Sequence, residues 1–142
     1  MIDVLFVNAA SRKQVYQGLA RFSAVEPPVW SGLIAQHAKE CGLAVEILDA
    51  EALGLDTERT ALEILARSPT LCVLSIYGQQ PSASTQCMPA ALEVLEYLKI
   101  GGRAAFPILA LGTHPSALPQ ETLAEGFDYV CQGEGPHTIM AL

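Results

Sequence analysis

The chain has 142 residues, of which 51% are hydrophobic and 16% charged, and its formal net charge is −7. A chain of this length can bury a core of its own, and this hydrophobic fraction excludes disorder over most of it. The chain has eight basic and fifteen acidic residues, and the basic ones form no concentrated block. We therefore expect neither nucleic acid nor an anionic membrane as a partner. The sequence also contains no apolar stretch of the roughly 20 residues that cross a bilayer. Because it lacks a signal-peptide pattern as well, we expect a cytoplasmic protein.

Five short runs of β-forming residues alternate with helical patterns. The runs cover residues 3–8, 44–49, 71–76, 107–111 and 127–131. The first, third and fourth are almost continuously apolar, as strands covered on both faces are. The second and fifth carry Glu46 and Asp128 at alternating positions, which predicts two edge strands.

Proline before a run and glycine after it mark the ends of the intervening helices. We expect helices over 29–41, 57–68 and 88–99, with shorter ones after Pro119 and from Pro136. In the first helix Trp30, Leu33, Ile34, His37 and Cys41 share a mostly apolar face that we expect to pack on the sheet, with His37 partly buried. The order of elements predicts an α/β fold, a doubly wound five-stranded parallel sheet of order 2-1-3-4-5 with helices on both faces.

The four cysteines are widely spaced along the chain. Cys41, Cys72, Cys87 and Cys131 form neither a CxxC nor a CxxxCxxC motif. We therefore expect four free thiols and no zinc or iron–sulfur site within this chain.

The segments that follow the strands predict a ligand site. In open α/β sheets ligands bind beyond the carboxyl ends of the strands. Glycine and small hydroxyl or amide residues make up the four segments that meet there, which are 8–12, 75–80, 112–116 and 132–135. Such residues let a ligand approach the backbone and offer neutral hydrogen bonds. The first connection, 9–28, is also far longer than the usual two to six residues of such loops.

Three common uses of this fold lack their signatures. A phosphoacceptor domain needs acidic residues and a lysine where this chain has Asn8, Ser75 and Gln132. The loop after the first strand has too few hydroxyl residues for a flavin phosphate. A GxGxxG dinucleotide fingerprint is absent, and Gly133-Glu134-Gly135 alone is a weak signal.

Several motifs together resemble a known family. They are the first strand with its small-residue loop, Pro27-Pro28-Val29-Trp30-Ser31-Gly32-Leu33, Gly112-Thr113-His114-Pro115-Ser116 and Gly133-Glu134-Gly135-Pro136. With these motifs the chain resembles, over nearly its whole length, the N-terminal cobalamin (B12)-binding domain of B12-dependent radical SAM proteins. That group includes the anaerobic magnesium-protoporphyrin monomethyl ester oxidative cyclase and several methyltransferases.

The resemblance implies that residues 1–142 form one cobalamin-binding domain, without catalytic or metal-ligating residues. S-adenosylmethionine and a 4Fe-4S cluster would belong to a following radical SAM domain, the expected partner in the same polypeptide. The cofactor-binding residues that it implies are Asn8, Ser75, Tyr77, Gly78, Gly112, Thr113, His114, Gly133 and Glu134. We also expect that Gly112→Val would prevent cofactor binding and leave the fold intact.

Many cobalamin domains place a cobalt-ligating histidine in a DxHxxG motif after the first strand. Residues 8–18 of this chain contain no histidine, so we expect base-off cobalamin with no protein histidine on cobalt. The lower face would hold water, nothing, or a weak contact from the long loop, for which Tyr16 is a candidate. Arg12 in this segment has three alternative roles, which are contact with the cobalamin phosphate, contact with the missing domain, or solvation of the loop. Two other functions stay open, a cofactor-free interaction domain and a flavodoxin-like small-molecule-binding protein.

Overall fold

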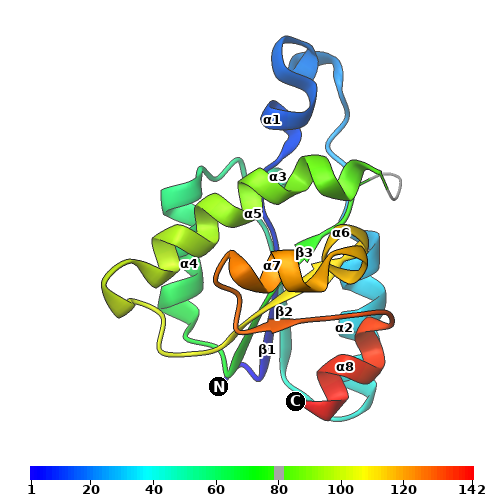
Figure 1. Cartoon of the computed structure of the whole chain (residues 1–142), viewed down its shortest axis with the longest axis vertical. Coiled ribbons are helices and arrows are strands. Elements are labelled where there is room, and N and C mark those ends of the chain that lie inside the picture. Colours follow the sequence, from blue (N-terminus) through cyan, green and yellow to red (C-terminus); the bar gives the residue numbers. More distant parts are fainter. Residues whose placement is uncertain (79–81) are drawn as a thin grey trace.

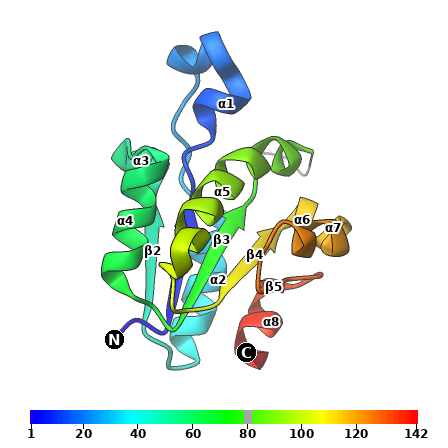
Figure 2. The ribbon, with the colours of Figure 1, turned by 60° about the vertical axis from the view of Figure 1, so that its left-hand side comes forward.

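The computed structural model describes residues 1–78 and 82–142. Over this part of the chain five parallel strands form one sheet in the order β2-β1-β3-β4-β5, as the sequence predicts. The strands are β1 (Val4–Asn8), β2 (Val45–Asp49), β3 (Leu71–Ile76), β4 (Ile108–Gly112) and β5 (Tyr129–Val130). Helices lie on both faces of the sheet (Figures 1 and 2), which confirms the predicted doubly wound fold.

The helices exceed those predicted in number. They are α1 (Arg12–Tyr16), η1 (Gln17–Phe22), α2 (Val29–Glu40), α3 (Ala50–Leu53), α4 (Thr57–Arg67), α5 (Ala83–Lys99), η2 (Ile100–Gly102), α6 (Thr113–Ala117), α7 (Pro119–Ala124) and α8 (Gly135–Ala141). Helix α5 begins five residues before the predicted start, so Pro89 lies inside it. Its first turn is anchored by the buried Ser84, whose hydroxyl donates to the Ile76 carbonyl at the end of β3.

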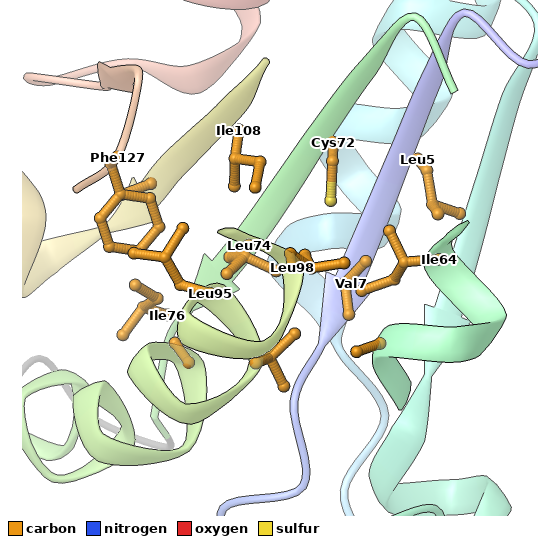
Figure 3. Close-up of a cluster of buried hydrophobic side chains, with 14 of the residues drawn as sticks. Leu5, Val7, Ile64, Cys72, Leu74, Ile76, Leu95, Leu98, Ile108 and Phe127 are labelled. Carbon is orange, nitrogen blue, oxygen red and sulfur yellow. The ribbon is translucent and has the colours of Figure 1, made fainter. Parts of the chain in front are cut away.

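Each face of the sheet has its own hydrophobic core. Alternate residues of β1 divide between them, with Leu5 and Val7 on the side of α4 and α5 and Phe6 on the side of α2 and α8. On the first side Ile64, Leu95, Leu98 and Phe127 complete a cluster of almost fully buried side chains (Figure 3). The prediction that β1, β3 and β4 are the most buried strands is confirmed.

The edge strands also agree with the sequence, although β5 is shorter than predicted. Strand β2 exposes Glu46 and Ile47, and β5 covers only Tyr129–Val130. Outside these two residues Phe127 turns into the core, and the Asp128 carboxylate accepts from the Ile108 backbone N–H at 2.8 Å. The backbone N–H groups of Asp128 and Cys131 still donate to β4, at the carbonyls of Ile108 and Ala110.

Of the predicted buried face of α2, Ile34 packs on the sheet and the other members do not. Trp30 and Leu33 are 55% and 60% exposed, and His37 is exposed as well. The residues that face the sheet are mostly small, namely Ser31, Ile34, Ala35 and Ala38. Small side chains let the helix approach the sheet closely, and this rotation leaves Trp30 and Leu33 beside the carboxyl ends of the strands.

The long connection between β1 and α2 is not a plain loop. It contains α1 and η1, which project beyond the carboxyl edge of the sheet (Figures 1 and 2). This is the edge at which ligands bind in such folds.

Candidate functional site

Two adjoining hollows lie at the carboxyl edge. The first, here named the loop hollow, has a volume of about 230 Å³ and lies between the ends of β1 and β3 and the long connection; its lining includes Asn8, Ser11, Arg12, Tyr16, Glu26, Glu51 and Ser75. The second, the helix hollow, has a volume of about 510 Å³ and lies between α2, the start of α8 and the segments after β3, β4 and β5. Its size falls in the range of about 300–1,000 Å³ that is typical of ligand pockets.

An aromatic pair forms a wall common to both hollows. Trp30 and Tyr77 line each of them, and their rings stack with centroids 5.8 Å apart and an interplanar angle of 29°. Burial raises the pKa of Tyr77, and electrostatic repulsion from Cys131 raises it by a smaller amount. The Tyr77 hydroxyl therefore stays protonated at neutral pH and offers a flat, uncharged surface with one polar tip.

Ser75 supplies an unsatisfied hydroxyl to the loop hollow. The residue is only 8% exposed, and its Oγ has no hydrogen-bond partner in the part of the chain that the structure describes. A buried hydroxyl without a partner costs about 1–3 kcal/mol. A ligand with a donor or acceptor at this point would recover that free energy, so the residue fits a polar cofactor group.

Asn8 is held in place by the next strand. Its Nδ2 donates to Asp49 Oδ1 at 2.8 Å, and the same oxygen accepts from the Ala52 N–H at the start of α3. The Asn8 side chain is thereby oriented before any ligand arrives, at the end of β1 in the lining of the loop hollow.

Arg12 ties the long connection to the domain. Its backbone N–H and its Nε each donate to one oxygen of the Glu51 carboxylate, at 2.9 and 3.1 Å. Its Nη1 donates to the carbonyls of Ala20 and Ser23, both at 3.0 Å. The guanidinium thus holds this connection in place. This role differs from the three predicted for Arg12, which were contact with the cobalamin phosphate, contact with the missing domain and solvation of the loop.

Thr113, Gly133 and Glu134 come together in the helix hollow, with Tyr77 and Gly78. The Gly133 N–H donates to Ser116 Oγ at 2.8 Å, and its φ of +93° is one that other residues rarely adopt. The Glu134 carboxylate is 81% exposed and lies 3.7 Å from the His137 ring.

Two predicted site residues lie elsewhere. Neither Gly112 nor His114 is among the described residues that line either hollow. His114 Nδ1 lies 2.9 Å from Thr85 Oγ1, and its backbone N–H donates to Ser84 Oγ at 3.0 Å. Gln79 and Gln80, part of a predicted ligand segment, fall outside the described residues.

Gly112 serves the packing of the sheet itself. A Cβ at this position would lie 2.1 Å from the backbone oxygen of Ile76 on the neighbouring strand. Real Cβ atoms do not approach that closely, so the expectation that Gly112→Val leaves the fold intact is wrong.

The sequence analysis missed the apolar part of the helix hollow, which consists mainly of Trp30, Leu33, Ile34 and Pro136. A signal was present for Trp30. A helix that follows a parallel strand begins at the carboxyl edge, so the first turn of α2, directly after Pro27-Pro28, had to lie near the site.

The described residues give two further results. They contain no group of three His, Cys, Asp or Glu side chains placed to hold a metal ion, and no helix among them is long and apolar enough to cross a membrane. All four cysteines are free, as predicted.

Comparison with known proteins identifies the fold family. A family model described as the B12 binding domain matches residues 18–142. The chain belongs to this family. No curated protein matches this B12-binding domain, so the family model and the solved structures carry the comparison.

Solved structures share the fold of this B12-binding domain. The cobalamin-dependent S-adenosylmethionine radical enzyme OxsB, with aqua-cobalamin and S-adenosylmethionine bound, matches 99% of the chain with a TM-score of 0.68 and 18% identity. The radical S-adenosylmethionine methyltransferase TsrM from Kitasatospora setae, with cobalamin and a [4Fe-4S] cluster bound, gives the same coverage, TM-score and identity. The domain spans 18% of the OxsB chain and 26% of the TsrM chain. The family model confirms the predicted cobalamin-binding domain, and the solved structures confirm its fold. The roles of individual site residues stay predictions.

Proposed function

We propose that this domain binds cobalamin at the carboxyl edge of its sheet and presents it to a radical SAM domain of the same, longer polypeptide. Two of its structural neighbours are radical SAM enzymes with cobalamin bound, and each is several times longer than this chain. Residues 1–142 then form the cofactor-binding domain, which is not catalytic alone. S-adenosylmethionine and a [4Fe-4S] cluster belong to the catalytic domain. We also propose a cytoplasmic location, in line with four free thiols.

The observation that carries the proposal is the buried, unpartnered hydroxyl of Ser75 in a hollow at the ligand-binding edge. Cobalamin has a flat corrin rimmed by amide side chains and a nucleotide tail that ends in dimethylbenzimidazole. Neutral amides suit the loop hollow, where Asn8, Ser75 and Ser11 offer uncharged partners. The tail suits the adjoining helix hollow, whose lining is mainly apolar. Once bound, the cofactor would supply the cobalt centre for methyl or radical chemistry.

We further propose that cobalamin binds base-off, without a protein histidine on cobalt. The connection 9–28 contains no histidine, and the His114 ring is engaged with Thr85 outside both hollows. His37 is exposed on α2, and His137 is 86% exposed. Tyr16 lines the loop hollow and is the residue through which we expect a weak lower contact.

Electron paramagnetic resonance of the cob(II)alamin form tests this coordination. We expect a spectrum without nitrogen superhyperfine splitting. A nitrogen pattern that disappears in His114→Ala would show that His114 ligates cobalt and would refute this part of the proposal.

The binding proposal is tested by the Ser75→Ala variant. The chain is incubated with hydroxocobalamin and desalted, retention is measured by visible absorbance, and affinity is measured by equilibrium dialysis. We expect the parent chain to retain the cofactor and Ser75→Ala to bind about tenfold more weakly, which corresponds to one lost hydrogen bond of about 1.4 kcal/mol. The ligand-free variant should be as stable as the parent, or more stable by about 1 kcal/mol, because it buries no unsatisfied hydroxyl.

Ser68→Ala is the matched control, because Ser68 is exposed and precedes β3 at the opposite edge of the sheet. It should leave affinity unchanged. Failure of the parent chain to retain cobalamin would refute the proposal in favour of a cofactor-free interaction domain. Retention of a yellow flavin in its place would favour the flavodoxin-like alternative.

A further inference from the structure

The apolar surface of the helix hollow comes mainly from the first turns of α2 and the start of α8. Trp30, Leu33 and Ile34 contribute from α2, and Pro136 faces them from the start of α8. Trp30 and Leu33 are 55% and 60% exposed. Large exposed apolar side chains that gather at the rim of a cavity indicate a surface that a ligand covers.

Polar side chains in the lining of the helix hollow are few, namely Thr113, Glu134 and Tyr77. Thr113 has an interaction within the chain. The Glu134 carboxylate is 81% exposed and lies beside His137, so it is at the solvent side of the hollow. The Tyr77 ring is stacked on Trp30. A ligand group inside the hollow therefore meets mainly hydrocarbon and aromatic surface.

This lining distinguishes between the tails of different corrinoids. Corrinoids share the corrin ring but end in different bases, such as dimethylbenzimidazole, with two methyl groups, or adenine, with an exocyclic amine and additional ring nitrogens. Methyl groups gain free energy when they leave water for an apolar surface. Adenine's polar atoms lose their hydrogen bonds to water there, and the site offers few replacements.

We propose that the helix hollow selects corrinoids with a benzimidazole tail over those with a purine tail, and that Leu33 and Trp30 set this preference. The inference rests on the proposed function, since it concerns the tail of the same cofactor. It goes further in naming the ligand class that the domain accepts and the residues responsible.

Three corrinoids test the selectivity on the 142-residue chain. They are cobalamin, its adenine-tailed analogue, and cobinamide, which has the same corrin and no tail base. Affinity is measured by equilibrium dialysis with corrin absorbance as the readout. We expect cobalamin to bind at least tenfold more tightly than the adenine-tailed analogue, and cobinamide to bind more weakly than cobalamin.

Trp30 supplies an independent readout of location. It is the only tryptophan of the chain, and it lines both hollows. Its fluorescence should be quenched by cobalamin at the concentrations at which dialysis shows binding. Unquenched Trp30 fluorescence in the saturated complex would place the ligand elsewhere and overturn the inference.

Leu33→Asn changes the apolar rim of the hollow without opening the core, because Leu33 is largely exposed. We expect cobalamin to bind about tenfold more weakly and the preference over the adenine-tailed analogue to shrink by a similar factor. Leu62→Asn is the matched control, since Leu62 is a 49% exposed leucine on α4, outside both hollows. It should leave all three affinities unchanged.

The outcomes separate the two proposals. If none of the three corrinoids binds, the proposed function fails, and the inference fails with it. If cobalamin and the adenine-tailed analogue bind equally well, or cobinamide binds as tightly as cobalamin, the inference is overturned while cobalamin binding stands. The same conclusion follows if Leu33→Asn leaves the preference unchanged.

Discussion

Replacing Gly112 by alanine should destabilise the sheet, although the change adds only one methyl group. Gly112 is the last residue of β4 and pairs with Ile76 of β3. The added Cβ would lie 2.1 Å from the Ile76 backbone oxygen and 2.8 Å from its carbonyl carbon. Favourable contacts between such atoms begin near 3.5 Å, so the two strands must separate by more than an ångström at this point.

The separation affects the hydrogen bonds around that carbonyl. Ser84 donates its hydroxyl to the Ile76 oxygen and accepts from the His114 N–H at 3.0 Å. Loss of these two bonds costs about 1 kcal/mol each, and overpacking of a close contact costs about 1–3 kcal/mol more. We therefore expect Gly112→Ala to lower the free energy of unfolding by about 3–5 kcal/mol, a large part of the total of about 5–15 kcal/mol for a domain.

Urea denaturation followed by circular dichroism measures this change, and thermal unfolding should show a Tm lower by about 10 °C. Gly32→Ala is the control. Gly32 lies within α2, and a Cβ there would meet no atom within 4 Å. Alanine should stabilise the helix at that position by up to about 1 kcal/mol. If Gly112→Ala unfolds within about 0.5 kcal/mol of the parent, the strand ends are not as closely packed as described and the reasoning fails.

Two further predictions concern the long connection and the core. Arg12→Ala should leave the sheet folded but raise the rate of proteolysis within 9–28. Four hydrogen bonds from Arg12 hold that segment, and the variant loses the three that come from the side chain. Cleavage at the parent's rate would contradict this role. Burial raises the pKa of Cys72 from 9.0 to about 12, so the folded chain keeps a proton that the unfolded chain loses, and stability should fall as pH rises from 9 to 12. Cys72→Ala should reduce that slope in urea titrations, and equal slopes in the parent chain and the variant would refute the assignment.

The class of fold and the strand order follow from local patterns in the sequence. Continuous apolar runs identify β1, β3 and β4, since a strand covered on both faces has no polar side to show. The ends of the helices are also determined by residues close to them in the sequence. Asp56 accepts from the Arg59 N–H at 2.8 Å at the start of α4, because a capping side chain needs only the backbone of the next turn.

The location of the site at the carboxyl edge also follows from the sequence, because it depends only on chain order in a parallel sheet. Small polar residues follow β1, β3, β4 and β5 in the sequence. Seven of the nine predicted site residues line one hollow or the other. These residues are Asn8, Ser75, Tyr77, Gly78, Thr113, Gly133 and Glu134.

The tertiary structure alone decided which face of α2 packs on the sheet. The helix carries one face with Trp30 and Leu33 and another with Ser31, Ala35 and Ala38, and periodicity favours the larger side chains for the core. Where α2 contacts β1, β2 and α8, the side chains that it buries are Ser31, Ala35 and Ala38 with the larger Ile34, and not Trp30 or Leu33. The same packing set Gly112 against Ile76 and brought Arg12 to Glu51, 39 residues away. Such pairings depend on distances between strands and helices that no short segment of sequence contains.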